Sequence, residues 1–365
     1  MGPTTAPHRA ANPLITSRRG QIWIAGEKIS GTYGTLQRAP LFASWEAPET
    51  VIHPCPLVLI HGGGGQGTDW TGTPDGRPGW ATRFVEAGFV VYVVDRPGHG
   101  RSPYHPGVVG EMGAPFPYEV AKSLFYPDDA ATEQTQWSYS RTSESDEVDQ
   151  LVAAMGPLPE DLAESQRMDA ERLGRLLDLT GPAVLVTHSA GAPAGWLTAN
   201  ERPDLVKAIV AVEPIGPAFA EFPGIGRLDW GLTAAPMTYE PDRESAEEAF
   251  NAAAGTLKIP ALRGTPVAVL TGGASVFAAF APQVVDFLQT AGASVEWIHL
   301  PEQGIEGNGH GLIFEANSDE IARLVADWIA TRIAHNAPLD TSTSRSDPEI
   351  VLAPGKGVVS LAGTP

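Results

Sequence analysis

The expected fold is inferred first from the stretch Ala183–Val184–Leu185–Val186–Thr187–His188–Ser189–Ala190–Gly191–Ala192–Pro193. A short apolar run rich in β-branched residues ends at a serine, and small residues that can begin a helix follow at once. This layout predicts a nucleophile elbow, in which a sharp turn between a strand and a helix exposes the oxygen of Ser189. Thr187 stands where the usual Gly-x-Ser-x-Gly spacing has its first glycine. A buried strand that ends in an ordinary serine helix cap is the alternative interpretation, so other stretches must decide between the two.

Composition limits the kinds of partner. The chain has 365 residues, of which 42% are hydrophobic, so it can bury a large core. Its formal net charge of −19 opposes binding to nucleic-acid phosphates and to an anionic membrane surface. Cys55 is the only cysteine, which excludes an intrachain disulfide and a thiolate metal cluster. We therefore expect a small-molecule substrate and no nucleic-acid or membrane partner, with a homodimer left open.

The two ends of the chain differ in composition from its middle. Residues 1–20 contain Pro, Thr and Arg but no continuous apolar segment, and no run in the chain approaches the ~18 apolar residues of a membrane span. We expect a loose leader over 1–20 and a cytoplasmic protein, although a leader removed earlier would leave no trace. Residues 336–365 predict a mobile tail of Pro, Ser, Thr and Gly.

Apolar runs alternate with helical patterns between these ends, which predicts one α/β domain over residues 21–335. Its sheet is expected to be mostly parallel and doubly wound, with antiparallel strands at its N-terminal edge. The predicted antiparallel strands include Gln21–Ala25 and Leu41–Trp45, and the predicted parallel strands are Pro56–Ile60, Phe89–Val94, the run that ends at Ser189, Ala208–Val212, Pro266–Leu270 and Ser294–Leu300. The predicted helices are Trp80–Gly88, Gln166–Leu179, Pro282–Thr290 and Ser318–Ile333.

Two long irregular segments, 103–165 and 215–262, predict a cap or lid over the carboxyl ends of the strands. The aromatic residues in the first of them favour an ordered lid over a disordered loop. Together with Trp70 and Trp80, these aromatic residues are candidates for the lining of an apolar pocket, and Trp70 is our candidate substrate-binding residue.

A serine nucleophile needs a base and a group that orients the base. His310 is the predicted base, because it lies in the glycine-rich loop 304–311 after the last strand, where an imidazole is poorly placed for core packing. His188 adjoins the nucleophile but is expected to point away from it. His61 is expected to orient the glycine loop that follows it, and His99 to lie inside a turn.

The acid is predicted at an unusual place. In such a fold the acid commonly follows the strand Pro266–Leu270, but the loop Thr271–Phe277 contains no carboxylate. Glu213 stands directly after the neighbouring strand, and its longer side chain can span the extra distance. We therefore assign Glu213 to hold the imidazole, with Asp286 as a poorer alternative because it lies inside a predicted helix.

The stretch His61–Gly62–Gly63–Gly64–Gly65–Gln66–Gly67 predicts an oxyanion loop. Glycines let backbone N–H groups face a substrate oxygen, and the absence of a following Lys argues against a phosphate-binding loop. A flexible linker is the alternative. The predicted donors are the N–H groups of Ala190 and Gly63, with Gly64 close behind. The sequence shows no metal-ligand spacing and no dinucleotide fingerprint, so no metal and no cofactor are expected.

Several of these stretches together resemble the α/β-hydrolase superfamily over residues 50–334. The resemblance rests on His61–Gly64, the turn Asp95–Ser102, Thr187–Gly191 and His310. Thr73–Trp80 and Gly304–His310 are more narrowly similar to a group of bacterial serine carboxylesterases whose triad acid is a Glu after the sixth strand. Some members of that group have adjacent cysteines where this chain has Gly63 and Gly64, so no disulfide is implied here.

The resemblance implies a serine hydrolase without a cofactor that cleaves a carboxylic ester through an acyl-enzyme, with Ser189, His310 and Glu213 as its triad. Lactone, amide or carbon–carbon bond hydrolysis on the same triad stays open, because the pocket rather than the triad selects among them. A non-catalytic binding protein on this scaffold is the second hypothesis, motivated by Thr187 and by the displaced acid.

Overall fold

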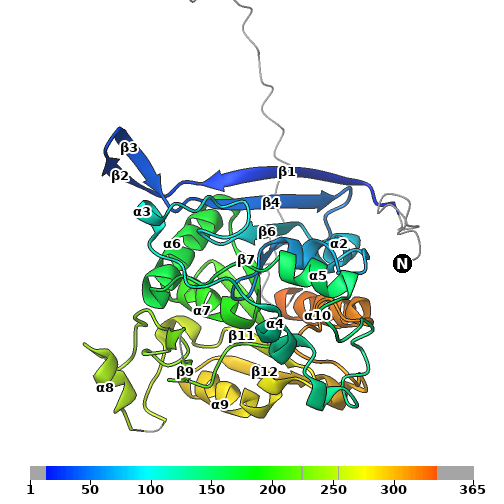
Figure 1. The fold of residues 1–365 in the computed structure, drawn as a ribbon. Helices are drawn as coiled ribbons and strands as arrows, with labels where there is room; N and C mark the ends of the chain where they lie inside the picture. Colours follow the sequence, from blue (N-terminus) through cyan, green and yellow to red (C-terminus); the bar gives the residue numbers. More distant parts are fainter. Residues whose placement is uncertain (1–13, 223–224, 254, 335–365) are drawn as a thin grey trace, which may run out of the picture.

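A computed structural model describes residues 14–222, 225–253 and 255–334 of the chain. One sheet of eight strands runs through the molecule in the order β1-β4-β6-β5-β7-β8-β11-β12, from the top to the bottom of Figure 1. Its strands are β1 (Ser17–Ile24), β4 (Leu41–Pro48), β5 (Leu57–Ile60), β6 (Val91–Asp95), β7 (Ala183–His188), β8 (Val206–Val212), β11 (Pro266–Thr271) and β12 (Ser294–His299). The strands from β6 to β12 pair in parallel, whereas β1 and β4 pair antiparallel. The predicted fold class is therefore confirmed.

The helices of the described residues are α1 (Thr68–Thr71), α2 (Trp80–Glu86), α3 (Pro106–Val109), α4 (Tyr118–Phe125), α5 (Asp146–Ala153), α6 (Leu162–Thr180), α7 (Ala192–Glu201), α8 (Ala246–Phe250), α9 (Ala281–Ala291) and α10 (Ser318–Ala334). Helices α2 and α10 cover one face of the sheet, and α6, α7 and α9 cover the other, as a doubly wound fold requires. Two small hairpins pair β2 (Glu27–Gly31) with β3 (Gly34–Arg38) and β9 (Glu221–Phe222) with β10 (Gly226–Arg227).

Alternation along the buried strands divides the core into two clusters. In β5, Leu57 and Leu59 pack with the helices α2 and α10, whereas Val58 and Ile60 pack with α6, α7 and α9. All four residues of β5 are fully buried, which explains why this run is continuously apolar instead of alternating with polar residues.

Two predicted boundaries are corrected by the structure. β1 begins at Ser17, inside the predicted leader 1–20, because it pairs with β4 from Ser17 opposite Pro48 onward. α6 begins at Leu162, earlier than the predicted start at Gln166, because the Asp161 side chain caps it by accepting the N–H of Glu164 at 2.9 Å. The predicted tail, 336–365, and the first 13 residues of the predicted leader lie outside the described residues.

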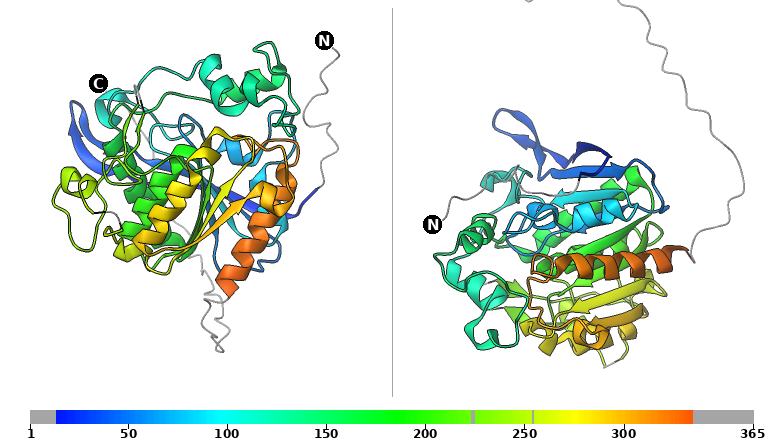
Figure 2. Two further views of the ribbon diagram at one scale, coloured as in Figure 1. Left: turned by 90° about the horizontal axis from the view of Figure 1, so that it is seen from below. Right: turned by 90° about the vertical axis from the view of Figure 1, so that its right-hand side faces the viewer.

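The two long segments predicted as caps lie at one end of the parallel strands. The first contains α3, α4, the short turn η2 (Asp128–Ala130) and α5, and Figure 2 shows it beyond the strand ends. The second contains the β9–β10 hairpin and α8. Across the described residues, none of the helices has both the length and the apolar character needed to cross a bilayer. The loops that carry the predicted site residues leave the sheet at this same end.

Candidate active site

The serine turn lies where β7 meets α7. Ser189 has a φ of 52°, a left-handed conformation that is uncommon for a residue with a side chain, and the turn η3 (Ser189–Gly191) continues into α7. A Cβ at Gly191 would lie 2.4 Å from the carbonyl oxygen of His61, so only glycine fits there. Thr187 is accommodated because Gly195 faces it: a Cβ at Gly195 would lie 2.9 Å from the Thr187 methyl group. The departure from the usual motif at Thr187 is thus compensated by Gly195 on α7, eight residues later.

Three side chains distant in sequence meet beside this turn. The Ser189 hydroxyl lies 3.1 Å from His310 Nε2, and His310 Nδ1 lies 3.3 Å from Glu213 Oε2. The ionised Glu213 carboxylate can only accept a hydrogen bond, so in that state Nδ1–H donates to Glu213 and Nε2 is left to accept the Ser189 proton. His310 and Glu213 are both buried, at 1% and 0% exposure. This arrangement orients an imidazole as a base toward a hydroxyl.

The loop that lacks a carboxylate supplies the partners of Glu213 instead. The N–H of Gly272 donates to Glu213 Oε1 at 2.6 Å, and the Ser275 hydroxyl donates to Oε2. The backbone of Glu213 is left-handed at a φ of 50°, and its N–H donates to the Leu270 carbonyl at 2.8 Å. Asp286, the alternative acid, is exposed on α9. Sequence analysis missed Ser275 because a single Ser in a loop carries no signal of its partner.

Burial opposes charge on both members of the His–Glu pair. It raises the pKa of Glu213 to about 8, against the hydrogen bonds from Ser275 and Gly272, which lower it. Burial likewise lowers the pKa of His310 to about 3, so its imidazole is neutral over the ordinary pH range. Within this pair, the ionisation of Glu213 is therefore the protonation step that varies near neutral pH.

The glycine loop after β5 abuts the serine turn. A Cβ at Gly63 would lie 3.2 Å from the Ala190 Cβ. Ala190 lies in the first turn of a helical segment, where backbone N–H groups have no intrahelical acceptor. Gly63 and Ala190 both line the cavity described below, whereas Gly64 does not. Gly64 has a φ of 66°, and its carbonyl accepts the N–H of Gly156 from the lid segment at 2.5 Å.

His61 and Arg96 hold this glycine loop in place. His61 Nε2 accepts the backbone N–H of Arg96 at 3.0 Å, and the Arg96 guanidinium donates to the Gly62 carbonyl at 2.9 Å. Asp169 pairs with the same guanidinium at 3.0 Å. These contacts match the orienting role that we predicted for His61.

A cavity of about 250 Å³ opens above Ser189. Both cap segments line it, the first with residues such as Phe116, Phe125 and Leu158, and the second with residues such as Ile215, Ile225 and Leu228. Its polar lining is sparse and includes Asp69, Gln166 and His188. Within the described residues, no three His, Cys, Asp or Glu side chains converge so that they could hold a metal ion.

The predicted substrate contact at Trp70 is wrong. Trp70 is fully buried and does not line the cavity. Its ring packs 5.7 Å from the Trp80 ring and, edge-on, 6.4 Å from the His188 ring. Trp70 is thus a core residue beneath the site.

We predicted that the His188 side chain points away from Ser189, but it lines the same cavity and contacts the loop of His310. Its Nε2–H donates to the backbone carbonyl of His310 at 3.0 Å, and the two rings lie 4.8 Å apart. Burial lowers the pKa of His188 to about 3, so it stays neutral. Alternation along β7 separates His188 from the Ser189 side chain, but the His310 loop folds back over it, which the local sequence does not show.

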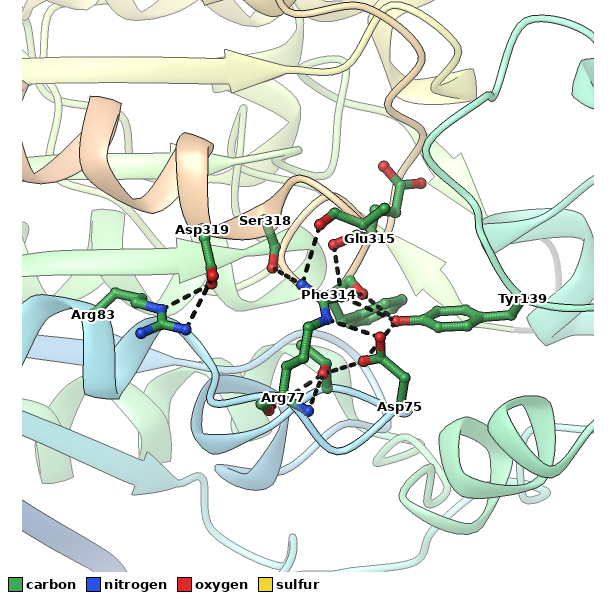
Figure 3. Close-up of polar contacts among 10 residues, drawn as sticks. Asp75, Arg77, Arg83, Tyr139, Phe314, Glu315, Ser318 and Asp319 are labelled. Atoms are coloured by element: carbon green, nitrogen blue, oxygen red, sulfur yellow. Dashed lines mark hydrogen bonds and ion pairs between the residues drawn. The ribbon is translucent and has the colours of Figure 1, made fainter. Parts of the chain in front are cut away.

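The segment that follows the His310 loop is held by the stretch Thr73–Trp80. Arg77 donates to the carbonyl oxygens of Glu315 at 3.1 Å and Ala316 at 3.2 Å, and its other edge pairs with Asp75 at 2.8 Å (Figure 3). Tyr139 from the lid segment donates to the Phe314 carbonyl at 2.6 Å in the same cluster. The stretch Thr73–Trp80 is thus fixed to residues 314–316, which follow the loop of the predicted base.

The buried side chain of Glu315 holds the His310 loop by hydrogen bonds. It is fully buried and accepts hydrogen bonds from Asn308 Nδ2 at 2.8 Å, from the N–H of Gly309 at 3.0 Å and from Gln134 Nε2 at 2.7 Å. Burial raises the pKa of Glu315 to about 7. Because Gln134 belongs to the lid segment, the lid contacts the loop that carries His310. Nothing in the sequence near Glu315 predicted this contact.

Comparisons with known proteins agree with the observed fold. Residues 57–335 match the family model described as "Alpha/beta hydrolase family". The chain is 34% identical over 334 residues to a protein of Fungal sp. (strain ATCC 74256) named "Probable secreted lipase phiG", covering 84% of this chain and 90% of that protein. Its fold is similar to that of a solved bacterial esterase, with a TM-score of 0.66 and 23% identity over 88% of this chain and 99% of the other.

The expectation of a cytoplasmic protein is wrong. The relative at 34% identity is named a probable secreted lipase, and the similarity extends over most of both chains. A missing apolar segment in residues 1–20 was too weak a basis for assigning a compartment. The fold is settled by the family match, which covers most of the described residues. This chain belongs to the alpha/beta hydrolase family.

Proposed function

We propose that the protein is a serine carboxylesterase that works through a Ser189–His310–Glu213 triad. One observation carries the proposal: a continuous hydrogen-bonded series from Glu213 through His310 to Ser189 ends at an apolar cavity. The names of the two relatives, a probable secreted lipase and a bacterial esterase, support ester hydrolysis in general.

The proposed reaction begins with attack of Ser189 Oγ on the ester carbonyl carbon. His310 Nε2 takes the hydroxyl proton during the attack, and the backbone N–H groups of Gly63 and Ala190 stabilise the negative charge that develops on the carbonyl oxygen. His310 then returns the proton to the departing alcohol, which leaves an acyl group on Ser189. Water then attacks the acyl carbon while His310 removes one of its protons. His310 gives this proton to Ser189 Oγ as the bond between Oγ and the acyl carbon breaks, which releases the acid and restores the free hydroxyl.

Glu213 stabilises the imidazolium that forms at each proton transfer. Its carboxylate lies against Nδ1 and keeps the proton on that nitrogen, so that Nε2 always faces the reacting oxygen. The raised pKa of Glu213 means that this role depends on pH. The apolar cavity favours the acyl or alcohol chain of an ester over a charged substrate.

Turnover of p-nitrophenyl butyrate and labelling by a fluorophosphonate probe test the proposal. We expect Ser189→Ala to abolish both and His310→Ala to abolish turnover, whereas Ser30→Ala, at an exposed serine of the β2–β3 hairpin, retains both. Unlabelled Ser189 in a folded protein would instead favour a binding protein on a hydrolase scaffold. Turnover by Ser189→Ala equal to that of the unmodified chain would overturn the mechanism.

A further inference from the structure

Gln166 is a buried amide in the wall of the same cavity as Ser189. It lies near the start of α6, and only 2% of it is exposed. Its neighbours in the cavity wall include the apolar side chains of Leu162, Ile225 and Leu228. The proposed triad and oxyanion donors make no use of it.

The orientation of this amide is fixed by the second cap segment. The backbone N–H groups of Ala234 and Ala235 donate to Gln166 Oε1 at 2.7 and 3.3 Å. Only the amide oxygen can accept these bonds, so the amide cannot be rotated to exchange its oxygen and nitrogen. Its Nε2, with two N–H donors, is therefore the end that faces away from the cap backbone.

These donors have no partner in the described part of the chain. Among the described residues, no acceptor makes a hydrogen bond with Gln166 Nε2. This atom also differs from the unpaired polar atoms that the protein encloses completely, because part of its surface stays accessible. It is therefore open to the cavity that Gln166 lines. A donor held in this way in an apolar wall orients a ligand that brings a matching acceptor, since leaving it unpaired in a complex is costly.

We infer that Gln166 is a specificity-determining residue that selects esters with a second, neutral oxygen acceptor. This inference rests on the proposed esterase function. The acceptor would be a carbonyl, ether or hydroxyl oxygen in the chain away from the scissile bond. A carboxylate is disfavoured because the cavity wall is mostly apolar and because Asp69, whose pKa burial raises to about 7, repels an anion when it is ionised. The preferred substrate class is therefore an oxygenated ester, distinct from the plain hydrocarbon chain of a simple fatty acid.

Matched substrates test this inference. Values of kcat/KM are compared for p-nitrophenyl alkanoates and for oxo-substituted alkanoates of equal length, with the carbonyl moved along the chain, and for acetates of plain and oxo-substituted alcohols. We expect at least one oxo ester to exceed its plain partner by roughly 5- to 100-fold, the range of one hydrogen bond to a buried donor. The same preference should vanish in Gln166→Met, which fills similar space without a donor.

The ratio of kcat/KM for an oxo ester to kcat/KM for its plain partner distinguishes a role of Gln166 in substrate recognition from a role in supporting the cap. Loosening the cap in Gln166→Met would lower the rates with both esters alike and leave their ratio unchanged. Gln166→Glu keeps an oxygen for the N–H groups of Ala234 and Ala235, and its carboxylate cannot donate, so the preference should fall as this carboxyl ionises. Asn200→Asp is the matched control, because Asn200 also accepts a cap N–H, that of Thr238, but lies outside the cavity.

Two failures can be told apart. If the unmodified chain hydrolyses none of the esters, the proposed function fails first. If it hydrolyses plain esters, but no oxo ester is preferred or Gln166→Met keeps the preference, the role of Gln166 is overturned and the esterase proposal stands.

Discussion

Replacing Glu213 by Gln isolates the charge and proton-accepting ability of the proposed acid without changing its shape. The amide must place its oxygen against the Gly272 N–H, which approaches Glu213 Oε1 at 2.6 Å, because two N–H groups facing each other at that distance would repel. The amide nitrogen then faces His310 Nδ1 and can only donate to it. His310 is forced to carry its proton on Nε2, where it can no longer accept the proton of Ser189.

The expected loss follows from this wrong tautomer. An Asp-to-Asn change at the corresponding place in a serine protease lowers kcat about 10⁴-fold. The opposite amide orientation would cost about 1–3 kcal/mol for the unpaired Gly272 N–H, so it offers only a partial escape. We therefore expect Glu213→Gln to lower kcat by roughly 10³- to 10⁴-fold, which is about 4–5.5 kcal/mol of transition-state stabilisation.

Single-turnover acylation by p-nitrophenyl butyrate measures this loss directly, and thermal unfolding shows whether the fold is intact. A neutral amide replaces a carboxyl whose charged form is opposed by burial, so the midpoint of unfolding should stay nearly unchanged. Glu296→Gln is the control, since Glu296 is a half-exposed carboxylate on β12 that binds Arg332. A folded Glu213→Gln variant with kcat within about tenfold of the unmodified chain would refute the reasoning and move the acid elsewhere.

Three further predictions follow from the same geometry. Burial raises the pKa of Glu213 and lowers that of His310, so kcat/KM should rise with pH as Glu213 loses its proton. This acidic limb of the pH profile should disappear in Glu213→Gln. A limb near the ordinary pKa of histidine that survives the substitution would contradict the prediction. Gly63→Val should lower kcat by roughly 10²- to 10³-fold. A Cβ at this position would lie 3.0 Å from Leu158 Cδ2, so the added methyl groups would displace the loop and its N–H donor. Acylation kinetics would check this, and an unchanged kcat would place the donor elsewhere. Arg77→Met should destabilise the fold by about 1–3 kcal/mol in urea unfolding and lower kcat more than it raises KM, since the carbonyl groups of Glu315 and Ala316, just after the His310 loop, lose their donor. An equal change in kcat and KM would mean that Arg77 does not position His310.

The local pattern of residues was sufficient for the elements that build the sheet. Continuous apolar runs such as Leu57–Ile60 can be satisfied only between two layers of helices, so they predicted a parallel, doubly wound sheet before any contact was known. The elbow at Ser189 and the position of Glu213 after β8 were predictable for a related reason, because the carboxyl ends of parallel strands meet at one edge. Their distance in sequence does not matter once the strand order is inferred.

What the sequence could not determine is where side chains point once loops fold over one another. Trp70 and His188 show this in opposite directions: the first enters the core, and the second lies under the His310 loop. The partners of Glu213 on the Gly272 loop, the Arg77 cluster and the free donor of Gln166 arise from segments far apart in the chain. Periodicity records which residues are buried against a regular element, so the sequence by itself determined the sheet, the elbow and the strand ends that carry the candidate triad. Hydrogen bonds between irregular loops depend on distances and angles that no local pattern encodes, so only the tertiary structure decided how His310 is held and what lines the cavity.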